Sequence, residues 1–412
     1  MRAEEMNMKE TIKIGVVGYG QRGHFVLRDT ILPREEIEVV AVCDVYEDRC
    51  KEAAAYITEV KGKMPVTTTD YHDILAMEEV EAVVIMSAWA GHIQIAIDAM
   101  KAGKYVGCEV GGAYSLDECW QLVHAYEETG VPCMMLENCC YGRNELLVLN
   151  MVRQGLFGEI VHCQGGYMHD LRNEISRGNE IRHYRLNNYM NRNCENYPTH
   201  ELGPIARVLN INRGNRMLTL NSVASKAIGL HEYLVRERGA DDELSKVLFA
   251  QGDVVTTIIK CAHGETIPLT LDNTLPRTYS RGFHIQGTKG IYQEDNQSVF
   301  LEDAHMKYHE EGWSEQWNNV EQYYEQYDHP IWKKYLSDGV RPGHGGMDWL
   351  VFNAFFDAVK NGTQTPIDVY DMATWMSIAT LSEASVSMGG APVAIPDFTN
   401  GRWISRKSEN DL

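Results

Sequence analysis

Tyrosine, histidine and arginine side chains, which can carry protons or bind polar ligands, gather between residues 167 and 200. Tyr167 and His169 end an apolar segment, Arg185 follows, and Tyr197-Pro198-Thr199-His200 precedes a predicted helix. Histidine titrates near neutral pH, whereas tyrosine has a pKa near ~10 and needs a neighbouring cation to act as a base. Each residue alone is more often a packing residue, but their accumulation indicates a site that moves protons.

Familiar hydrolase and metal motifs do not explain this cluster. His200-Glu201 is not the start of H-E-x-x-H, because Pro204 occupies the second histidine position, and no G-x-S-x-G segment occurs. The ten cysteines lack C-x-x-C spacing and lie mostly in apolar stretches. We therefore expect buried thiols in a reducing compartment and no metal site.

A glycine-rich turn follows the first apolar segment, Ile12 to Val17. It reads Gly18-Tyr19-Gly20-Gln21-Arg22-Gly23 and leads into a helix-like segment, and a second apolar segment ends at Asp44. This order of strand, glycine turn, helix and acidic residue is typical of dinucleotide binding, with the carboxylate on a ribose hydroxyl. Asp44 would repel a 2'-phosphate and Val45-Tyr46 supply no cation, so the pattern favours NAD over NADP.

The elements around this turn alternate between apolar strands and amphipathic helices. Such alternation predicts an α/β domain over residues 10–138, with a doubly wound parallel sheet of the Rossmann type. Polar side chains follow three successive strands, and we expect them to contact the cofactor at the carboxyl edge of the sheet. These residues are Trp89 and His92, then Glu109 and Val110, then Glu137 and Asn138.

The remaining residues, 139–412, predict an α+β domain. Alternating stretches joined by turns at His263-Gly264 and Gly287 to Gly290 indicate a large open, mainly antiparallel sheet. Two closing helices, Gly346 to Asn361 and Tyr370 to Ser387, are expected to pack back toward the first domain. The polar, aromatic stretch from Glu310 to Val340 is long for a loop, which indicates short helices or a lid.

Composition excludes several classes of protein. The chain has 58 acidic and 38 basic residues, a net charge of -20, which argues against nucleic acid or an anionic membrane as its main partner. Its apolar runs are shorter than the ~20 residues of a membrane span. Because no apolar export segment precedes the first strand, we expect a cytoplasmic protein.

Several ordered motifs resemble one family over nearly the whole chain. The glycine turn, the Trp89 to His92 loop and the Glu109 strand end resemble the glucose-fructose oxidoreductase superfamily. Within it, the sequence is similar to the NAD-dependent α-N-acetylgalactosaminidases of glycoside hydrolase family 109. The matching segments are Met134 to Asn138, Gly165 to Asp170, Tyr197 to His200 and Gly343 to Asp348.

The resemblance implies a function for each matched position. The cofactor positions are Gln21, Arg22, Asp44, Trp89, His92, Glu109, Val110, Asn138 and Tyr197, and the substrate positions are Tyr167, Arg185, Tyr197, Pro198, Thr199, His200 and Tyr279. The implied substrate is a small glycoside or oligosaccharide, and a homo-oligomer through the open sheet is a family expectation.

The implied chemistry is a redox-neutral cycle on tightly bound NAD. Oxidation at C3 of the sugar acidifies the C2 proton, the C1 leaving group is eliminated, water adds, and C3 is reduced again. We expect His200 to deprotonate the C3 hydroxyl and Tyr167 to take the C2 proton, while His169, Tyr197 and Tyr279 shape the site. Glu137 is either a proton relay or sugar ligand, or a structural carboxylate.

The usual superfamily lysine after Glu109 is Val110 here, which resembles the glycosidase branch and argues against an ordinary sugar dehydrogenase. The sequence departs from the pattern of that branch at two positions. Gly111 replaces a common proline, which is expected to loosen the cofactor loop, and Glu201 replaces a common glycine, which is expected to add charge beside the site. A sugar oxidoreductase and a non-catalytic NAD- or sugar-binding protein stay open as alternatives.

Overall fold

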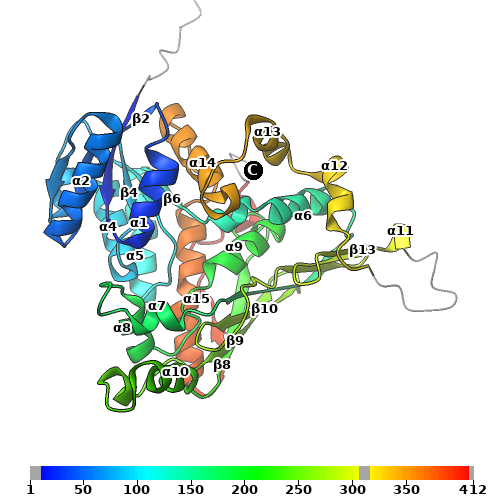
Figure 1. The fold of residues 1–412 in the computed structure, drawn as a ribbon. Coiled ribbons are helices and arrows are strands. Elements are labelled where there is room, and N and C mark those ends of the chain that lie inside the picture. Colours follow the sequence, from blue (N-terminus) through cyan, green and yellow to red (C-terminus); the bar gives the residue numbers. More distant parts are fainter. Residues whose placement is uncertain (1–10, 306–315, 408–412) are drawn as a thin grey trace, which may run out of the picture.

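The computed structural model describes residues 11–305 and 316–407, which form two sheets with helices around them (Figure 1). The first sheet has six parallel strands in the order β3-β2-β1-β4-β5-β6, and the order reverses between β1 and β4. This is the strand order of a Rossmann sheet, which confirms the predicted fold of this region. The strands are β1 (Ile12–Val17), β2 (Ile37–Cys43), β3 (Val66–Thr68), β4 (Ala82–Ile85), β5 (Tyr105–Cys108) and β6 (Cys133–Met135).

Helices cover both faces of this sheet, so its central strands are almost fully buried. Local sequence sets their ends: Ser115 and Glu118 form a capping box at the start of α5, and Gly62 and Gly130 end α2 and α5 in the left-handed conformation. The helices are α1 (Gln21–Val26), its π-helical continuation η1 (Leu27–Ile31), α2 (Glu47–Lys61), α3 (Tyr71–Leu75), α4 (Trp89–Lys101) and α5 (Leu116–Thr129).

The second sheet has eight strands in the order β13-β12-β11-β7-β10-β9-β8-β14. Described neighbours pair antiparallel except β7 and β10, which are parallel, so the mainly antiparallel prediction is confirmed. The predicted turns join β9 to β10 and β11 to β12. The strands are β7 (Ile160–Met168), β8 (Met217–Ala224), β9 (Val254–Cys261), β10 (Thr266–Asp272), β11 (His284–Gly287), β12 (Gly290–Gln293), β13 (Ser298–Leu301) and β14 (Val393–Ala394).

Short helices connect and cover this second sheet. The predicted helical content between Glu310 and Val340 is present from Val320 onward, whereas residues 310–315 lie outside the described residues. The helices are η2 (Asn138–Tyr141), α6 (Arg143–Arg153), α7 (Arg172–Ser176), α8 (Arg185–Asn191), α9 (Thr199–Val208), α10 (Gly229–Arg238), η3 (Leu244–Lys246), α11 (Glu302–His305), η5 (Val320–Tyr323), α12 (Tyr324–Tyr327), α13 (Pro330–Asp338), η6 (His344–Gly346), α14 (Met347–Asn361), α15 (Val369–Ser387) and η7 (Arg402–Ile404).

Of the two long C-terminal helices, α14 contacts the first sheet and α15 contacts both sheets. Helix α14 packs against β1 and η1, and α15 packs between α5 on one side and β8 on the other (Figure 1). Arg34 reinforces the contact to α14, because its guanidinium donates to the Trp349 carbonyl at 2.9 Å. No helix among the described residues is long and apolar enough to cross a bilayer.

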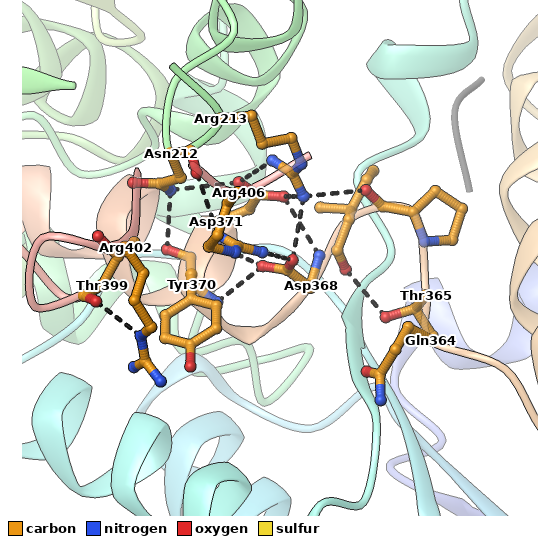
Figure 2. Close-up of polar contacts among 12 residues, drawn as sticks. Asn212, Arg213, Gln364, Thr365, Asp368, Tyr370, Asp371, Thr399, Arg402 and Arg406 are labelled. Atoms are coloured by element: carbon orange, nitrogen blue, oxygen red, sulfur yellow. Dashed lines mark hydrogen bonds and ion pairs between the residues drawn. The ribbon is translucent and has the colours of Figure 1, made fainter. Parts of the chain in front are cut away.

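A buried ion network fixes the start of α15 (Figure 2). Arg213 donates to both oxygens of Asp371, each at 2.7 Å, and to Asp368 at 3.0 Å. Arg406, near the end of the described chain, also contacts Asp368, and Asn212 donates to Asp371 at 3.2 Å. Because Asp371 is fully buried, loss of its cationic partner would leave an uncompensated charge in the core.

Candidate active site

A cavity of about 900 Å³ opens at the carboxyl ends of the parallel strands. Its walls include the ends of β1 and β2 and the segments after β4, β5 and β6, and residues of the second sheet face them from the other side. Ligands of open α/β sheets bind at this edge, and the volume suits a dinucleotide with a small second ligand.

The structure brings most of the predicted site residues to this one cavity. Those that line it are Gly18, Gly20, Gln21, Arg22, Asp44, Trp89, His92, Glu109, Val110, Asn138, Tyr167, His169, Arg185, Tyr197 and His200. The predicted residues that lie outside the lining are Tyr19, Gly23, Glu137, Pro198, Thr199 and Tyr279.

The glycine turn has the geometry that a bound dinucleotide requires. Gly18 has φ +101°, and a Cβ there would lie 2.5 Å from the Met86 backbone. A Cβ on Gly23 would lie 2.4 Å from the Gly18 carbonyl oxygen. Gly20, the N-cap of α1, leaves the helix N-terminus without a side-chain cap, so its N–H groups can face a phosphate. The residues present therefore fit NAD.

Asp44 is held rigidly at the same end of the cavity. Its Oδ2 accepts the Tyr19 N–H at 2.7 Å, and its Oδ1 accepts the Tyr46 N–H at 3.0 Å. These bonds join the glycine turn to the end of β2 and fix the carboxylate where a ribose hydroxyl would be recognised.

Two arginines that the sequence analysis missed also line this end of the cavity. Arg49 Nη1 lies 3.8 Å from Asp44 Oδ2, and Arg49 Nη2 donates to the Ile181 carbonyl at 3.0 Å. Arg182 binds Asp48 through two bonds of 3.0 and 2.7 Å. The segment between α7 and α8 thus contacts α2. Arg49 was detectable, since it lies in the first turn of α2, shortly after Asp44.

A carboxylate network holds Arg22 in the middle of the cavity. Arg22 donates to Glu109 at 2.8 Å and to the two oxygens of Asp348 at 2.7 and 2.9 Å. Asn138 also donates to Asp348, at 2.7 Å. Burial raises the pKa of Asp348, but Arg22 and His344 outweigh burial and lower it well below its usual range. The Gly343 to Asp348 motif contained Asp348, which the candidate site omitted.

Trp89 lies against the aromatic residues at the other end of the cavity. Its ring stacks on Tyr197, with centroids 5.4 Å apart and planes at 28°. A Cβ on Gly111 would lie 2.7 Å from Trp89 Cδ1. Glycine at this position therefore permits tight packing of Trp89, while the expected loosening of the loop stays a prediction.

Tyr167 and Tyr197 form the wall opposite the glycine turn. Their ring centroids lie 4.5 Å apart, and the Tyr167 hydroxyl lies 3.4 Å from His169 Nδ1. Burial raises the pKa of Tyr167 although the Arg185 cation opposes it, so the free protein holds a neutral phenol. Burial and Arg185 lower the pKa of His169, which keeps its imidazole neutral and able to accept a proton.

His200 is oriented by a buried carboxylate. Its Nδ1 lies 2.7 Å from Glu137 Oε1, and its Nε2 lies 3.4 Å from the Tyr197 hydroxyl. Burial raises the pKa of Glu137, but His200, the Thr199 hydroxyl and the Cys139 N–H together outweigh burial and lower it. The ionised carboxylate therefore accepts the Nδ1 proton, and Nε2 is left as a hydrogen-bond acceptor that faces the Tyr197 hydroxyl.

Arg185 supplies the positive charge beside Tyr167 and Tyr197. Its guanidinium carbon lies 5.4 Å from the Tyr197 ring centroid and 6.0 Å from that of Tyr167, and Glu174 binds it in an ion pair. Glu174 lines the cavity and was not predicted. Tyr279 is 47% exposed and meets Tyr167 and His169 edge to face, which places it at the rim.

The sequence analysis expected Glu201 to add charge beside the cavity, and this expectation is wrong. Glu201 is buried between α9 and β7, where its Cβ lies 2.7 Å from the Cβ position of Gly165. Burial, together with repulsion from Glu195, raises the pKa of Glu201 well above its usual range. Glu201 is therefore a neutral residue behind the site.

Comparison with known proteins identifies the family. Residues 141–405 match the family described as glycosyl hydrolase 109, C-terminal domain, and residues 12–137 match the oxidoreductase family with an NAD-binding Rossmann fold. The chain is 39% identical to the α-N-acetylgalactosaminidase of Tannerella forsythia, over 96% of this chain and 88% of that protein. It is 38% identical to a glycosyl hydrolase family 109 protein of Parabacteroides distasonis, over 97% and 89% of the two chains.

A solved structure of levoglucosan dehydrogenase with NADH and levoglucosan has the same fold. Its TM-score is 0.69 at 18% identity, and the alignment covers 94% of this chain and all of that one. The two family matches together cover both sheets and identify the family of the chain. The chain belongs to glycosyl hydrolase family 109, with an N-terminal NAD-binding Rossmann fold.

Proposed function

We propose that this protein is an α-N-acetylgalactosaminidase that uses NAD in a redox-neutral cycle. The observation that carries the proposal is the single cavity in which the glycine turn and Asp44 face Tyr167, His169 and His200. A relative that is 39% identical bears this activity in its name, which supports the choice of sugar. We also propose that the chain divides at residue 138 into a cofactor domain and a substrate domain.

The cofactor-facing residues hold NAD across the edge of the first sheet. Gly18, Tyr19, Gly20, Gln21 and Gly23 shape the pyrophosphate turn, and Asp44 binds the adenosine ribose. The nicotinamide end is enclosed by Arg22, Trp89, His92, Glu109, Val110, Asn138 and Tyr197. NAD bound there supplies a reversible hydride acceptor for C3 of the sugar.

His200 removes the proton of the C3 hydroxyl. His200 lines the cavity, and its Nε2 lone pair can accept this proton because Nδ1–H is donated to Glu137. The buried Glu137 carboxylate stabilises the imidazolium that forms, so its role is to position and charge-balance His200.

Tyr167 takes the C2 proton once the C3 ketone has made it acidic. The phenol must first lose its own proton, and neutral His169, 3.4 Å away, is placed to receive it. Arg185 stabilises the phenolate that results. The proton on these two residues exchanges with solvent, so after the C1 leaving group departs and water adds, Tyr167 delivers a solvent-derived proton to C2.

The aromatic wall and rim recognise the sugar. Tyr167 and Tyr197 offer ring faces, and Arg185 and His169 offer polar contacts near them. Tyr279 closes the outer rim, while Pro198 and Thr199 fix the backbone that carries Tyr197 and His200 into the cavity.

Two further properties follow as proposals. All ten cysteines are free and buried, which supports a reducing, cytoplasmic location.

The outward side of neighbouring strands β9 and β8 carries exposed apolar side chains, Ile258 at 43% and Val223 at 54% exposure. These side chains support a homo-oligomer through the open sheet.

The proposal is tested by adding 4-nitrophenyl α-N-acetylgalactosaminide to the NAD-loaded protein while NADH absorbance is followed. We expect nitrophenol release without lasting NADH, and much slower release from the β-anomer. Stoichiometric NADH from free sugars without glycoside cleavage would instead identify a sugar oxidoreductase.

A further inference from the structure

The fold brings together three side chains of types that bind metal ions. One ligand atom from each of Glu137, Cys139 and His200 lies within 4.8 Å of the other two. Glu137 directly precedes η2 and Cys139 lies within it, whereas His200 comes from α9, sixty-one residues after Cys139. Their sequence spacing resembles no zinc motif, which is why the sequence analysis expected no metal site.

We propose that Glu137, Cys139 and His200 form a binding site for a divalent transition-metal ion such as Zn²⁺, and that the bound ion inhibits the enzyme. The inhibitory part rests on the function proposed above, in which His200 acts as a base. The binding part does not depend on that function.

The donor set is suited to a borderline-soft cation. Thiolate, imidazole and carboxylate are the three side-chain ligand types of protein zinc sites. Tetrahedral coordination separates neighbouring ligand atoms by about 3.3 to 3.6 Å, given Zn–N, Zn–O and Zn–S bonds of about 2.0 to 2.3 Å. His200 Nδ1 and Glu137 Oε1 lie 2.7 Å apart and all three ligand atoms lie within 4.8 Å of one another, so binding requires these two atoms to move apart around the ion.

An ion can reach these ligands through the sugar end of the cavity. His200 lines the cavity and its side chain is 14% exposed, whereas Glu137 and Cys139 lie buried behind it. Three protein ligands leave a fourth position, which water or a substrate hydroxyl would fill.

The charges balance in this buried position. Glu137 contributes a carboxylate, and Cys139 contributes a thiol that becomes a thiolate when it binds the ion. Binding forms an S–Zn bond and releases the thiol proton to solvent, so Zn²⁺, thiolate and carboxylate together carry no net charge.

Inhibition follows from the tautomer of His200. Without the ion, Nδ1–H is donated to Glu137 and the Nε2 lone pair accepts the substrate proton. An ion on Nδ1 displaces that proton, and neutral imidazole then carries its proton on Nε2. Nε2 becomes a donor, which removes the proposed base from the reaction.

The test uses the NAD-loaded enzyme and two single variants of neighbouring buried cysteines. Cys139→Ala removes the sulfur ligand and no proposed catalytic group. Cys140→Ala is the matched control, because Cys140 is equally buried but packs against Gly203. Each protein is titrated with Zn²⁺ in the glycosidase assay and with Co²⁺ in an absorption spectrometer.

We expect Zn²⁺ to inhibit the wild type and the Cys140→Ala variant equally, with full recovery on chelation. Cys139→Ala should keep basal activity and need at least tenfold more Zn²⁺ for the same inhibition. Co²⁺ should give a sulfur-to-cobalt charge-transfer band in the wild type and the Cys140→Ala variant but not in Cys139→Ala.

Equal zinc sensitivity of Cys139→Ala and the wild type, or a wild type without the cobalt–sulfur band, would overturn the site. A band without inhibition would retain the site and overturn its inhibitory role. If the protein cleaves no glycoside at all, the cobalt spectra still decide the binding claim, so that failure is distinguishable from a failure of the proposed function.

Discussion

The two ends of the cavity are built in different ways. The adenosine end comes from one continuous stretch, in which β1, the glycine turn, α1 and β2 place Gly18 to Asp44. The sugar end draws Glu137, Tyr167, Arg185 and His200 from four separate segments. The first end therefore depends on local backbone geometry, whereas the second depends on how the two sheets meet.

This difference predicts different responses to mutation. A lost contact at the adenosine end weakens cofactor binding, which added NAD can overcome by mass action. A lost group at the sugar end removes a proton-transfer step, which no concentration of cofactor restores. Added NAD should therefore restore the activity of variants at the adenosine end but not that of variants at the sugar end.

The largest effect is expected for His200→Ala. Loss of a positioned general base lowers kcat by ~10³-fold, and saturating NAD should not restore it. His124, an exposed residue on α5, provides a matched control, and its alanine variant should keep wild-type kcat. A His200→Ala enzyme within threefold of wild type would remove His200 from the reaction.

Glu137→Gln should have the next largest effect. The variant keeps a hydrogen-bond acceptor for His200 Nδ1 but loses the charge that balances the imidazolium. A charge-assisted hydrogen bond contributes about 1.5 to 3 kcal/mol, so kcat should fall about 10- to 100-fold with little change in KM.

Glu201→Gln is the control for this carboxylate, because Glu201 lies one residue from His200 but outside the cavity lining. Its kcat should match the wild type, and an equal loss in both variants would contradict a specific role for Glu137.

Asp44→Ala tests the opposite end. It removes the acceptors of the Tyr19 and Tyr46 N–H groups together with the ribose ligand, which should raise the Kd for NAD about 10- to 100-fold. Calorimetric NAD titration measures the loss, and kcat at saturating NAD should return to near the wild-type value. A kcat deficit that persists at saturation would break the distinction between the two ends.

The smallest effect concerns stability rather than turnover. Burial raises the pKa of Glu195 to about 8 from a usual value of 4.5. The folded protein therefore holds a proton that the unfolded chain releases, and this stabilisation is lost as pH rises from 4.5 through about 8. Glu195→Gln, which cannot ionise, should thus gain thermal stability relative to wild type between about pH 6 and pH 9. If the melting temperatures of the variant and the wild type differ by the same amount at every pH in this range, a buried neutral carboxyl is contradicted.

The sequence predicted the adenosine end almost completely because its signals are local. The spacing from Gly18 to Asp44 follows from one strand, one turn and one helix, and β1 has the predicted bounds. Short β3, β12 and β14 escaped prediction, since two to four residues give no readable period.

At the sugar end, the sequence predicted the residues but not the contacts between them. Family motifs pointed to Tyr167 and His200, but nothing in the spacing indicated that Asp348 binds Arg22 or that Cys139 lies beside His200. Glu201 was placed beside the cavity because it follows His200, whereas the helical turn directs its carboxyl toward β7. Long-range packing decided each of these positions.

The central claim is that the enzyme breaks the C2–H bond during glycoside cleavage, with Tyr167 as the base. The most direct measurement is hydrolysis in deuterated water, with the C2 position of the released sugar read by NMR. We predict one deuterium at C2 of every product molecule, and neither cleavage nor exchange in Tyr167→Phe. Product with hydrogen retained at C2 would contradict the account, because direct displacement at C1 leaves that bond intact.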